Sequence, residues 1–217
     1  MADWESFRKN HYELLGNAIV KNLDKKGYSA EYVVTAEEAK RKIIDLIPEK
    51  ASVGVPGSVT LRELGLLEAL EKRGNKIVHH WDPSLVGEER IRRLQEELSC
   101  DVFLTSANAL TIDGTIVNID GTGNRVAGMA WTSGKIIYVI GINKVCAGGL
   151  EAAIARVKNF ATPPNAMRLN IKTPCASLGY CVDCDVPERV CRAMLILERA
   201  PSGRDCHVIL VGEILGF

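Results

Sequence analysis

Small polar side chains and glycines that could bind an anion are concentrated in one stretch, DVFLTSANALTIDGTIVNIDGTGNR, which spans residues 101–125. Two glycines near its end would let backbone N–H groups approach a ligand, and the following arginine offers a forked donor to a carboxylate or phosphate. The stretch therefore predicts a small-anion site, whose candidate residues are Asn108, Asn118, Asp120, Gly121, Thr122, Gly123, Asn124 and Arg125.

Asp120 is the candidate for acid–base chemistry in this stretch. It could orient Arg125, or act as a general base if it is buried beside that arginine. Asp113 has a simpler explanation, because Asp113-Gly114 between two β-rich runs is a strong signal for a hairpin turn. Glu63 falls in the first turn of an expected helix, where the helix dipole favours a carboxylate.

A second candidate anion contact is the loop Gly54–Thr60, which lies between an expected strand and an expected helix. Gly57, Ser58 and Thr60 could present N–H groups and hydroxyls to an anion at the helix N-terminus. The alternative is an ordinary strand-to-helix turn in which Ser58 caps the helix. Lys144 follows another expected strand and is interpreted either as a contact for the same anion or as an exposed loop lysine.

His79, His80 and Trp81 follow a third expected strand, where open α/β sheets bind ligands. Alternation along a strand sends the two histidines to opposite faces, which argues against a metal-binding pair. The helix expected at Glu88–Ser99 turns Ile91, Leu94 and Leu98 inward. Its glutamates and arginines are interpreted as a solvated face.

Four of the seven cysteines form the pattern C-x5-C-x2-C-x6-C, at Cys175, Cys181, Cys184 and Cys191. Four thiols meet the ligand count of zinc or of an iron–sulfur cluster, although the spacing fits neither a zinc ribbon nor a ferredoxin. Reduced structural thiols and a redox dithiol remain open alternatives. The other three, Cys100, Cys146 and Cys206, are expected in the core.

Hydrophobic periodicity predicts an α/β fold with a mainly parallel sheet flanked by helices. Thr162-Pro163-Pro164-Asn165 is interpreted as a boundary, with an α/β core at residues 1–161. Residues 162–217 are expected to form a small cysteine-bearing β cap, with a C-terminal hairpin of 194–197 and 207–211, that completes the same domain. The expected helices are 4–26, 35–47, 61–73, 88–99 and 150–160, and the expected strands of the core are 51–55, 76–80, 102–104 and 135–140.

Composition excludes several classes of function. Lys and Arg together number 27, as do Asp and Glu, so the formal net charge of zero argues against binding nucleic acid by phosphate neutralisation. No apolar run approaches the length of a membrane span, and the charged N-terminus does not resemble a signal peptide. A cytoplasmic protein is therefore expected, in which cysteines are thiols or metal ligands before they are disulfides.

Several blocks resemble the LUD-domain (lactate-utilisation) family: SANALTIDGTIVNIDGT with the GNR after it, PGSVTLRELGL, GINKV, TPCASLGYCVDC and GEILGF. The resemblance runs from about residue 50 to the last residue. It implies a fold like that of the NagB/RpiA/CoA-transferase class and a role like that of accessory proteins of lactate oxidation. CoA-transferases of this class use a glutamate nucleophile, but no motif identifies Glu63 with it.

A more distant resemblance links the central stretch to methylthioribose-phosphate isomerases and to the regulatory subunits of translation initiation factor 2B. Their pattern GADxIxxNGxxxNKxGT aligns without a gap to residues 106–122. Asn108 stands where that pattern has an acid, and an amide cannot exchange a proton near pH 7. The substitution argues against an isomerase that carries its general base at this position.

Three functional hypotheses follow. In the first, the chain is an accessory component of lactate oxidation that binds a small anionic metabolite or a partner enzyme, with a metal or cluster at the cysteines. In the second, it is a stand-alone isomerase or transferase acting on a phosphorylated or CoA-linked substrate. In the third, it is a regulatory binding module without catalysis. The amphipathic first helix also offers a surface for a homo-oligomer.

Overall fold

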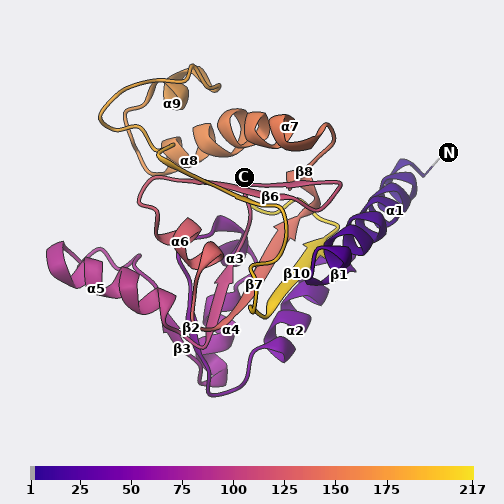
Figure 1. Cartoon of the computed structure of the whole chain (residues 1–217), viewed down its shortest axis with the longest axis horizontal. Helices are drawn as coiled ribbons and strands as arrows, with labels where there is room; N and C mark the ends of the chain where they lie inside the picture. The colour runs from indigo at the N-terminus through magenta and orange to yellow at the C-terminus, as the bar shows by residue number, and fades with distance from the viewer. Residues whose placement is uncertain (1–2) are drawn as a thin grey trace.

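The computed structural model describes residues 3–217, which form two β-sheets and their covering helices (Figure 1). The larger sheet has six strands in the order β1-β10-β7-β4-β2-β3, and every pairing in it is parallel. The predicted α/β fold with a mainly parallel sheet is therefore confirmed. Its strands are β1 (Ser29–Val33), β2 (Ser52–Gly54), β3 (Lys76–Val78), β4 (Val102–Thr105), β7 (Lys135–Gly141) and β10 (Cys206–Val211).

Strand β7 shows how the larger sheet is buried on both faces. Its residues 136–141 are all buried, as expected for an apolar strand between two layers. Because successive side chains point to opposite faces, Ile137 and Val139 join one hydrophobic core, whereas Ile136 and Tyr138 join the other.

Three helices cover the first face of the larger sheet: α2 (Ala36–Leu46), α3 (Val59–Glu63) and α4 (Leu66–Arg73). Thr35 caps the start of α2, since its Oγ1 accepts the backbone N–H of Glu38 at 3.2 Å. The single helix expected after Gly57 is divided in two. Gly65 adopts a left-handed conformation (φ +57°) between α3 and α4, which a helix cannot continue through.

The smaller sheet lies over the opposite face and has the strand order β8-β5-β6-β9. Strands β5 and β6 pair antiparallel, and Gly114 in the turn between them has a φ of +89°. This arrangement confirms the hairpin predicted from Asp113-Gly114. The four strands are β5 (Ala109–Thr111), β6 (Ile116–Asp120), β8 (Val145–Cys146) and β9 (Ala193–Leu197).

Helix α1 (Trp4–Lys25) packs Ile19 and Leu23 into the core beneath β1 and β10. The apolar stripe predicted for it is only partly buried, because Phe7 and Leu14 are 61% and 74% exposed. No helix among residues 3–217 combines the length and hydropathy that crossing a membrane requires. The remaining helices near this face are α5 (Gly87–Leu98) and α6 (Asn124–Ala130).

The boundary predicted at Thr162-Pro163-Pro164-Asn165 is instead a continuation of a helix. Helix α7 (Gly149–Arg156) passes through a π-helical segment, Val157–Ala161, directly into α8 (Thr162–Arg168). Both prolines lie in the first turn of α8, directly after the π-helical segment. Helices α7 and α8 lie on the outer side of the smaller sheet, with α9 (Pro174–Leu178) beyond them (Figure 1).

The predicted C-terminal hairpin is wrong. Strand β9 pairs antiparallel with β6 in the smaller sheet, whereas β10 lies between β1 and β7 in the larger one. The turn at Pro201-Ser202-Gly203 therefore joins two sheets and does not join two paired strands. Strands that are close in sequence often pair, but here β9 and β10 each pair with strands that are distant in sequence.

Candidate functional site

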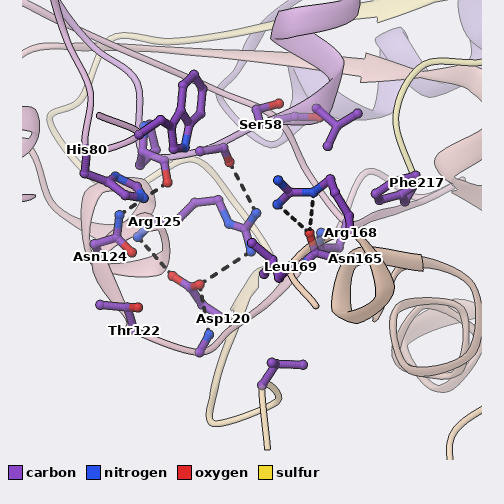
Figure 2. A pocket seen from close by; sticks show the side chains of 18 of the residues that line it. Ser58, His80, Asp120, Thr122, Asn124, Arg125, Asn165, Arg168, Leu169 and Phe217 are labelled. Atoms are coloured by element: carbon purple, nitrogen blue, oxygen red, sulfur yellow. Dashed lines mark hydrogen bonds and ion pairs between the residues drawn. The ribbon is translucent and has the colours of Figure 1, made fainter. Parts of the chain in front are cut away.

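A cavity of about 530 Å³ lies beyond the carboxyl ends of the parallel strands. Its walls come from the loops after β2, β3 and β4, from the turn between β6 and α6, and from α8 (Figure 2). Ligands of open α/β sheets bind at this edge, and the volume suits a small organic molecule. The site is thus assembled from segments more than a hundred residues apart in the chain.

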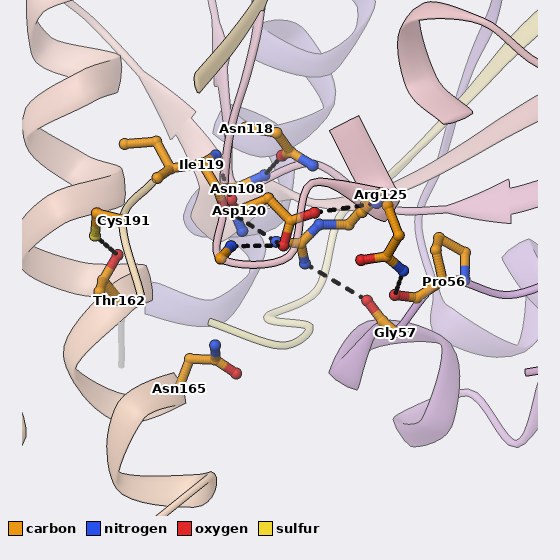
Figure 3. A network of polar contacts seen from close by, with 12 residues as sticks. Pro56, Gly57, Asn108, Asn118, Ile119, Asp120, Arg125, Thr162, Asn165 and Cys191 are labelled. Atoms are coloured by element: carbon orange, nitrogen blue, oxygen red, sulfur yellow. Dashed lines mark hydrogen bonds and ion pairs between the residues drawn. The ribbon is translucent and has the colours of Figure 1, made fainter. Parts of the chain in front are cut away.

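The structure brings most of the predicted anion-binding residues to this cavity. Asn118 and Gly123 do not line it. Asn118 is fully buried behind the wall, where its amide accepts the backbone N–H of Asn108 and contacts the sulfur of Met129 (Figure 3). The predicted residues that line the cavity are Gly57, Ser58, Thr60, Asn108, Asp120, Gly121, Thr122, Asn124, Arg125 and Lys144.

Lys144 is a buried cation at the base of the cavity, not an exposed loop lysine. Its side-chain Nζ donates to Thr60 Oγ1 at 2.8 Å and to Ser106 Oγ at 3.0 Å. No carboxylate among residues 3–217 lies within ion-pair distance of it. Burial, followed by the positive charges of Arg156 and Arg125, lowers the pKa of Lys144 to about 7.

Arg125 is held in place by the turn that precedes it. One carboxylate oxygen of Asp120 accepts the backbone N–H of Arg125 at 3.0 Å, and the other accepts that of Gly121 at 2.9 Å. The guanidinium donates to the carbonyls of Gly57 and Ile119 and lies 3.6 Å from Asp120 (Figures 2 and 3). Asp120 thus orients the arginine, and the arginine's Nε is buried without a hydrogen-bond partner in the described residues.

Three further arginines, which are not among the predicted site residues, also line the cavity: Arg62, Arg90 and Arg168. Arg62 stacks on the ring of Trp81, and Arg168 is held by the side-chain oxygen of Asn165 (Figure 2). Burial, followed by the charges of Arg62 and Arg125, lowers the pKa of Arg168. A wall lined by more arginine and lysine side chains than carboxylates favours an anionic ligand.

His80 lines the same cavity, and its Nδ1 lies 2.7 Å from a carboxylate oxygen of Glu97. Glu97 was assigned to the solvated face of its helix, which is wrong, because its side chain is fully buried. A signal for its burial is present in the sequence: Glu97 lies three residues after Leu94, on the apolar side of α5. His79 instead accepts the backbone N–H of Trp81 through its own Nδ1.

The C-terminal residues close one side of the cavity. The backbone N–H of Gly216 donates to the Glu63 carboxylate at 2.6 Å, and Phe217 lines the cavity wall. Glu63 therefore anchors the tail and does not point at a ligand. Gly216 has a φ of +60°, and a Cβ there would lie 2.6 Å from Thr60 Oγ1, so only glycine fits beside Lys144 and its partner.

The four clustered cysteines surround a separate small cavity, which Lys158 and Arg189 also line. Cys191 Sγ donates to Thr162 Oγ1, and Cys181 Sγ accepts the backbone N–H of Asp183. Among residues 3–217, no three His, Cys, Asp or Glu side chains are placed to hold one metal ion. The metal or cluster at these cysteines stays a prediction, whereas the burial of Cys100, Cys146 and Cys206 is confirmed.

The chain matches a known protein family over most of its length. Residues 17–211 match the family described as the LUD domain. A DUF162 family protein from Deinococcus radiodurans has a similar structure, with a TM-score of 0.54 and 14% identity, over 93% of this chain and 98% of that one. At this identity the likeness shows the fold alone.

A second solved structure, ribose 5 phosphate isomerase A from Neisseria gonorrhoeae, aligns over 52% of this chain and 56% of that one. Its identity to this chain is 22% and the TM-score is 0.34, which is too low to support an argument about the site. No curated protein sequence matches this chain significantly.

Proposed function

We propose, from the premise that this chain belongs to the LUD-domain family, that it binds a small anionic metabolite in the cavity between the strand ends and α8. The ligand would carry a carboxylate or a phosphate. The observation that carries the proposal is the buried Lys144, whose Nζ has two hydroxyl groups and no carboxylate as partners among residues 3–217. A buried cation without a counter-ion is costly, and a bound anion would supply the missing charge.

The surrounding groups support the same ligand chemistry. The buried Nε of Arg125 has no partner in the described residues, and Arg168 of helix α8 also lines the cavity. Arginine donates two parallel hydrogen bonds to a carboxylate or phosphate. Asp82 and Asp120 are the carboxylates at this wall, and Asp120 is already engaged by Arg125 and Gly121. The balance of charge at the wall thus remains positive.

The proposal is tested by titrating the protein with L-lactate, pyruvate and inorganic phosphate in a calorimeter at low salt. We expect at least one of them to bind, and Arg125→Ala to weaken its binding by about tenfold or more, since a charge-assisted hydrogen bond contributes about 1.5–3 kcal/mol. Arg92→Ala is the matched control, because Arg92 lies on the exposed face of α5 and, among the described residues, pairs with Glu88 alone. The proposed site would be contradicted if both variants lost the same affinity for the anion, or if Arg125→Ala left that affinity unchanged.

The wider role proposed is that of an accessory component of lactate utilisation, in contact with lactate-oxidising proteins. The alternatives are a stand-alone isomerase or transferase and a regulatory binding module. Asp120→Asn separates them, because the variant should lower the turnover of an enzyme by orders of magnitude and only weaken the binding of an accessory or regulatory protein. Catalytic turnover by the purified wild-type protein would decide for the enzyme.

We propose as a second candidate function that the cysteine cavity holds a metal centre or a redox-active thiol pair. The observation that favours it is the meeting of Cys175, Cys181, Cys184 and Cys191 around one cavity, with Lys158 and Arg189 at its wall. Lys158 and Arg189 both pair with Asp183, and burial raises the pKa of Cys191, so the proposal rests on the convergence of the four thiols.

The test is the iron, zinc and acid-labile sulfide content, with a visible spectrum, of protein purified without oxygen. Iron with sulfide would indicate a cluster and electron transfer, whereas zinc alone would indicate a structural site. Cys184→Ser should remove the metal and Cys206→Ser, in the core, should not. Metal-free protein with four free thiols would rule out both metal centres.

A further inference from the structure

Glu97 is a buried carboxylate on a helix that is otherwise largely charged and exposed. Its side chain is fully buried, because α5 ends directly against strand β2. Gly54 in β2 permits this contact: a Cβ at position 54 would lie 2.0 Å from the carbonyl oxygen of Glu97. The close approach of helix and strand therefore places a carboxylate behind the wall of the cavity.

The partners of Glu97 come from the cavity wall. One carboxylate oxygen lies 2.7 Å from His80 Nδ1, and the other accepts Asn124 Nδ2 at 3.4 Å. No Lys or Arg among residues 3–217 forms an ion pair with it. Burial raises the pKa of Glu97, and the hydrogen bond from His80 acts in the opposite direction. His80 is thus the titratable group paired with this buried carboxylate.

The rest of the His80 ring borders the cavity. Its side chain is 13% exposed and appears among the lining side chains in Figure 2. Gly57, with a φ of +104°, lies across from it, and a Cβ there would come within 3.6 Å of His80 Cε1. The charged neighbours are Arg90, which donates to the His80 carbonyl at 3.0 Å, and Arg62 over Trp81. Because Glu97 engages Nδ1, Nε2 is the nitrogen left for a ligand.

We propose that His80 is the acid–base group of this cavity and that Glu97 is its positioning residue. The inference rests on the proposed anion site, since the molecule acted on would be held by Arg125 and Lys144. Its chemical class is a small hydroxy or oxo acid, or a phosphate ester, with an exchangeable O–H or C–H proton. Nε2 takes that proton, the imidazole becomes imidazolium, and the same proton is then returned to another atom of the bound molecule. The Glu97 carboxylate stabilises the imidazolium and holds the Nδ1–H tautomer.

The first measurement is the tautomer of His80 by ¹⁵N NMR of histidine-labelled protein, with the signal assigned by His80→Gln. We expect the neutral ring to carry its proton on Nδ1. Glu97→Gln should shift the ring toward the Nε2–H form, because the amide can donate to Nδ1 where the carboxylate can only accept. The wild-type measurement decides the tautomer even if that variant does not fold.

The second measurement is the rate at which diethyl pyrocarbonate modifies each histidine, followed by mass spectrometry. His207 is the matched control, since it pairs with Asp205 at 2.8 Å but lies outside the cavity lining. We expect saturating inorganic phosphate to slow modification of His80 at least about fivefold and to leave His207 unchanged, because a bound anion would cover one ring only.

The two proposals fail in distinguishable ways. If calorimetry detects no anion binding, the proposed function fails. The tautomer of His80, and its response to Glu97→Gln, still tests whether Glu97 positions His80. If phosphate binds and Arg125→Ala abolishes that binding, but His80 remains unprotected or carries its proton on Nε2, the acid–base assignment is overturned while the anion site stands.

Discussion

Lys144 contributes a charge that depends on pH within the physiological range. Its pKa is lowered to about 7 by burial and by neighbouring arginines, so the ammonium form predominates only below that pH. We expect the affinity for L-lactate, whose carboxylate stays ionised, to fall as the pH rises from 6 to 8.5, by up to about tenfold. Calorimetry at both pH values checks this, and Lys144→Met should remove most of the difference. A pH dependence that survives in the variant would assign the effect to another group.

The same lysine couples stability to pH. Between pH 7 and its ordinary value of 10.5, Lys144 is neutral in the folded state and protonated in the unfolded one. The unfolded state then binds more protons, so this residue makes the free energy of unfolding rise with pH, by up to about 1.4 kcal/mol per pH unit. Urea unfolding at pH 7.5 and 9 should show a smaller rise for Lys144→Met than for wild type. An equal rise in both proteins would contradict the buried, uncompensated lysine.

Residue types predicted much of the cavity wall but not the burial of its charges. Asp120 and Arg125 could be chosen because their spacing, within a glycine-rich turn, is local. Glu97 and Lys144 could not be placed in the same way. Whether a glutamate or lysine is exposed depends on which strand or loop packs over it, and Gly54 and Gly216, which allow that packing, are distant in sequence.

At the scale of elements, the contact between α5 and β2 determines where Glu97 lies. Gly54→Ala would place a methyl group 2.0 Å from a backbone oxygen, which no side-chain rotation can relieve. We expect it to lower the free energy of unfolding by about 2–3 kcal/mol and to displace Glu97 from His80. Denaturant unfolding and the His80 tautomer measure the two effects.

Gly203→Ala provides the comparison for that variant. Gly203 lies in a turn with a φ of +72° and open space around its Cβ position. Backbone strain alone should cost it about 1 kcal/mol, with no change at His80. If Gly54→Ala were no more destabilising than Gly203→Ala, and left the tautomer intact, the close packing of α5 would not be what holds Glu97.

Single helices and strands were largely predictable, whereas their pairing partners were not. The turn at Asp113-Gly114 is a local signal, and the hairpin forms as expected. Strands β9 and β10 lie in different sheets, because β9 pairs with β6 and β10 pairs with β7. These partners are distant in sequence, so no local pattern predicts the pairing. Likewise, two prolines normally end a helix, but here they occupy the first turn of α8 after a π-helical segment.

At the scale of the whole molecule, the cavity joins both sheets and the outer helices. A ligand bound there would contact the loops around Gly57 and Ser106, the turn at Asp120 and helix α8. We expect saturating anion to slow hydrogen exchange in all four segments together, and to leave β1, which lies at the far edge of the larger sheet, unchanged. Exchange mass spectrometry measures this, with Arg125→Ala as the variant that should lose the effect. If the anion slowed hydrogen exchange in one segment alone, the four segments would not form one shared binding site.

The fold class of the molecule was predictable as a whole, because the alternation of apolar strands and amphipathic helices favours a parallel sheet. The second sheet was not predicted as a separate layer. Its strands are two to five residues long, and β8 has only Val145 and Cys146. Such short runs carry too little periodicity to reveal which sheet they join.

The strand order of the larger sheet has a consequence for how the chain folds during synthesis. Among the strands of residues 3–217, β1 comes first in the chain, and it pairs only with β10, which comes last. Until β10 emerges, the nascent chain exposes the edges of both β1 and β7. Pairing across so long a loop is slow, and unpaired apolar edges invite aggregation. Chains that stop before residue 206 should therefore bind chaperones more than chains that include β10, because β10 covers an edge of both β1 and β7.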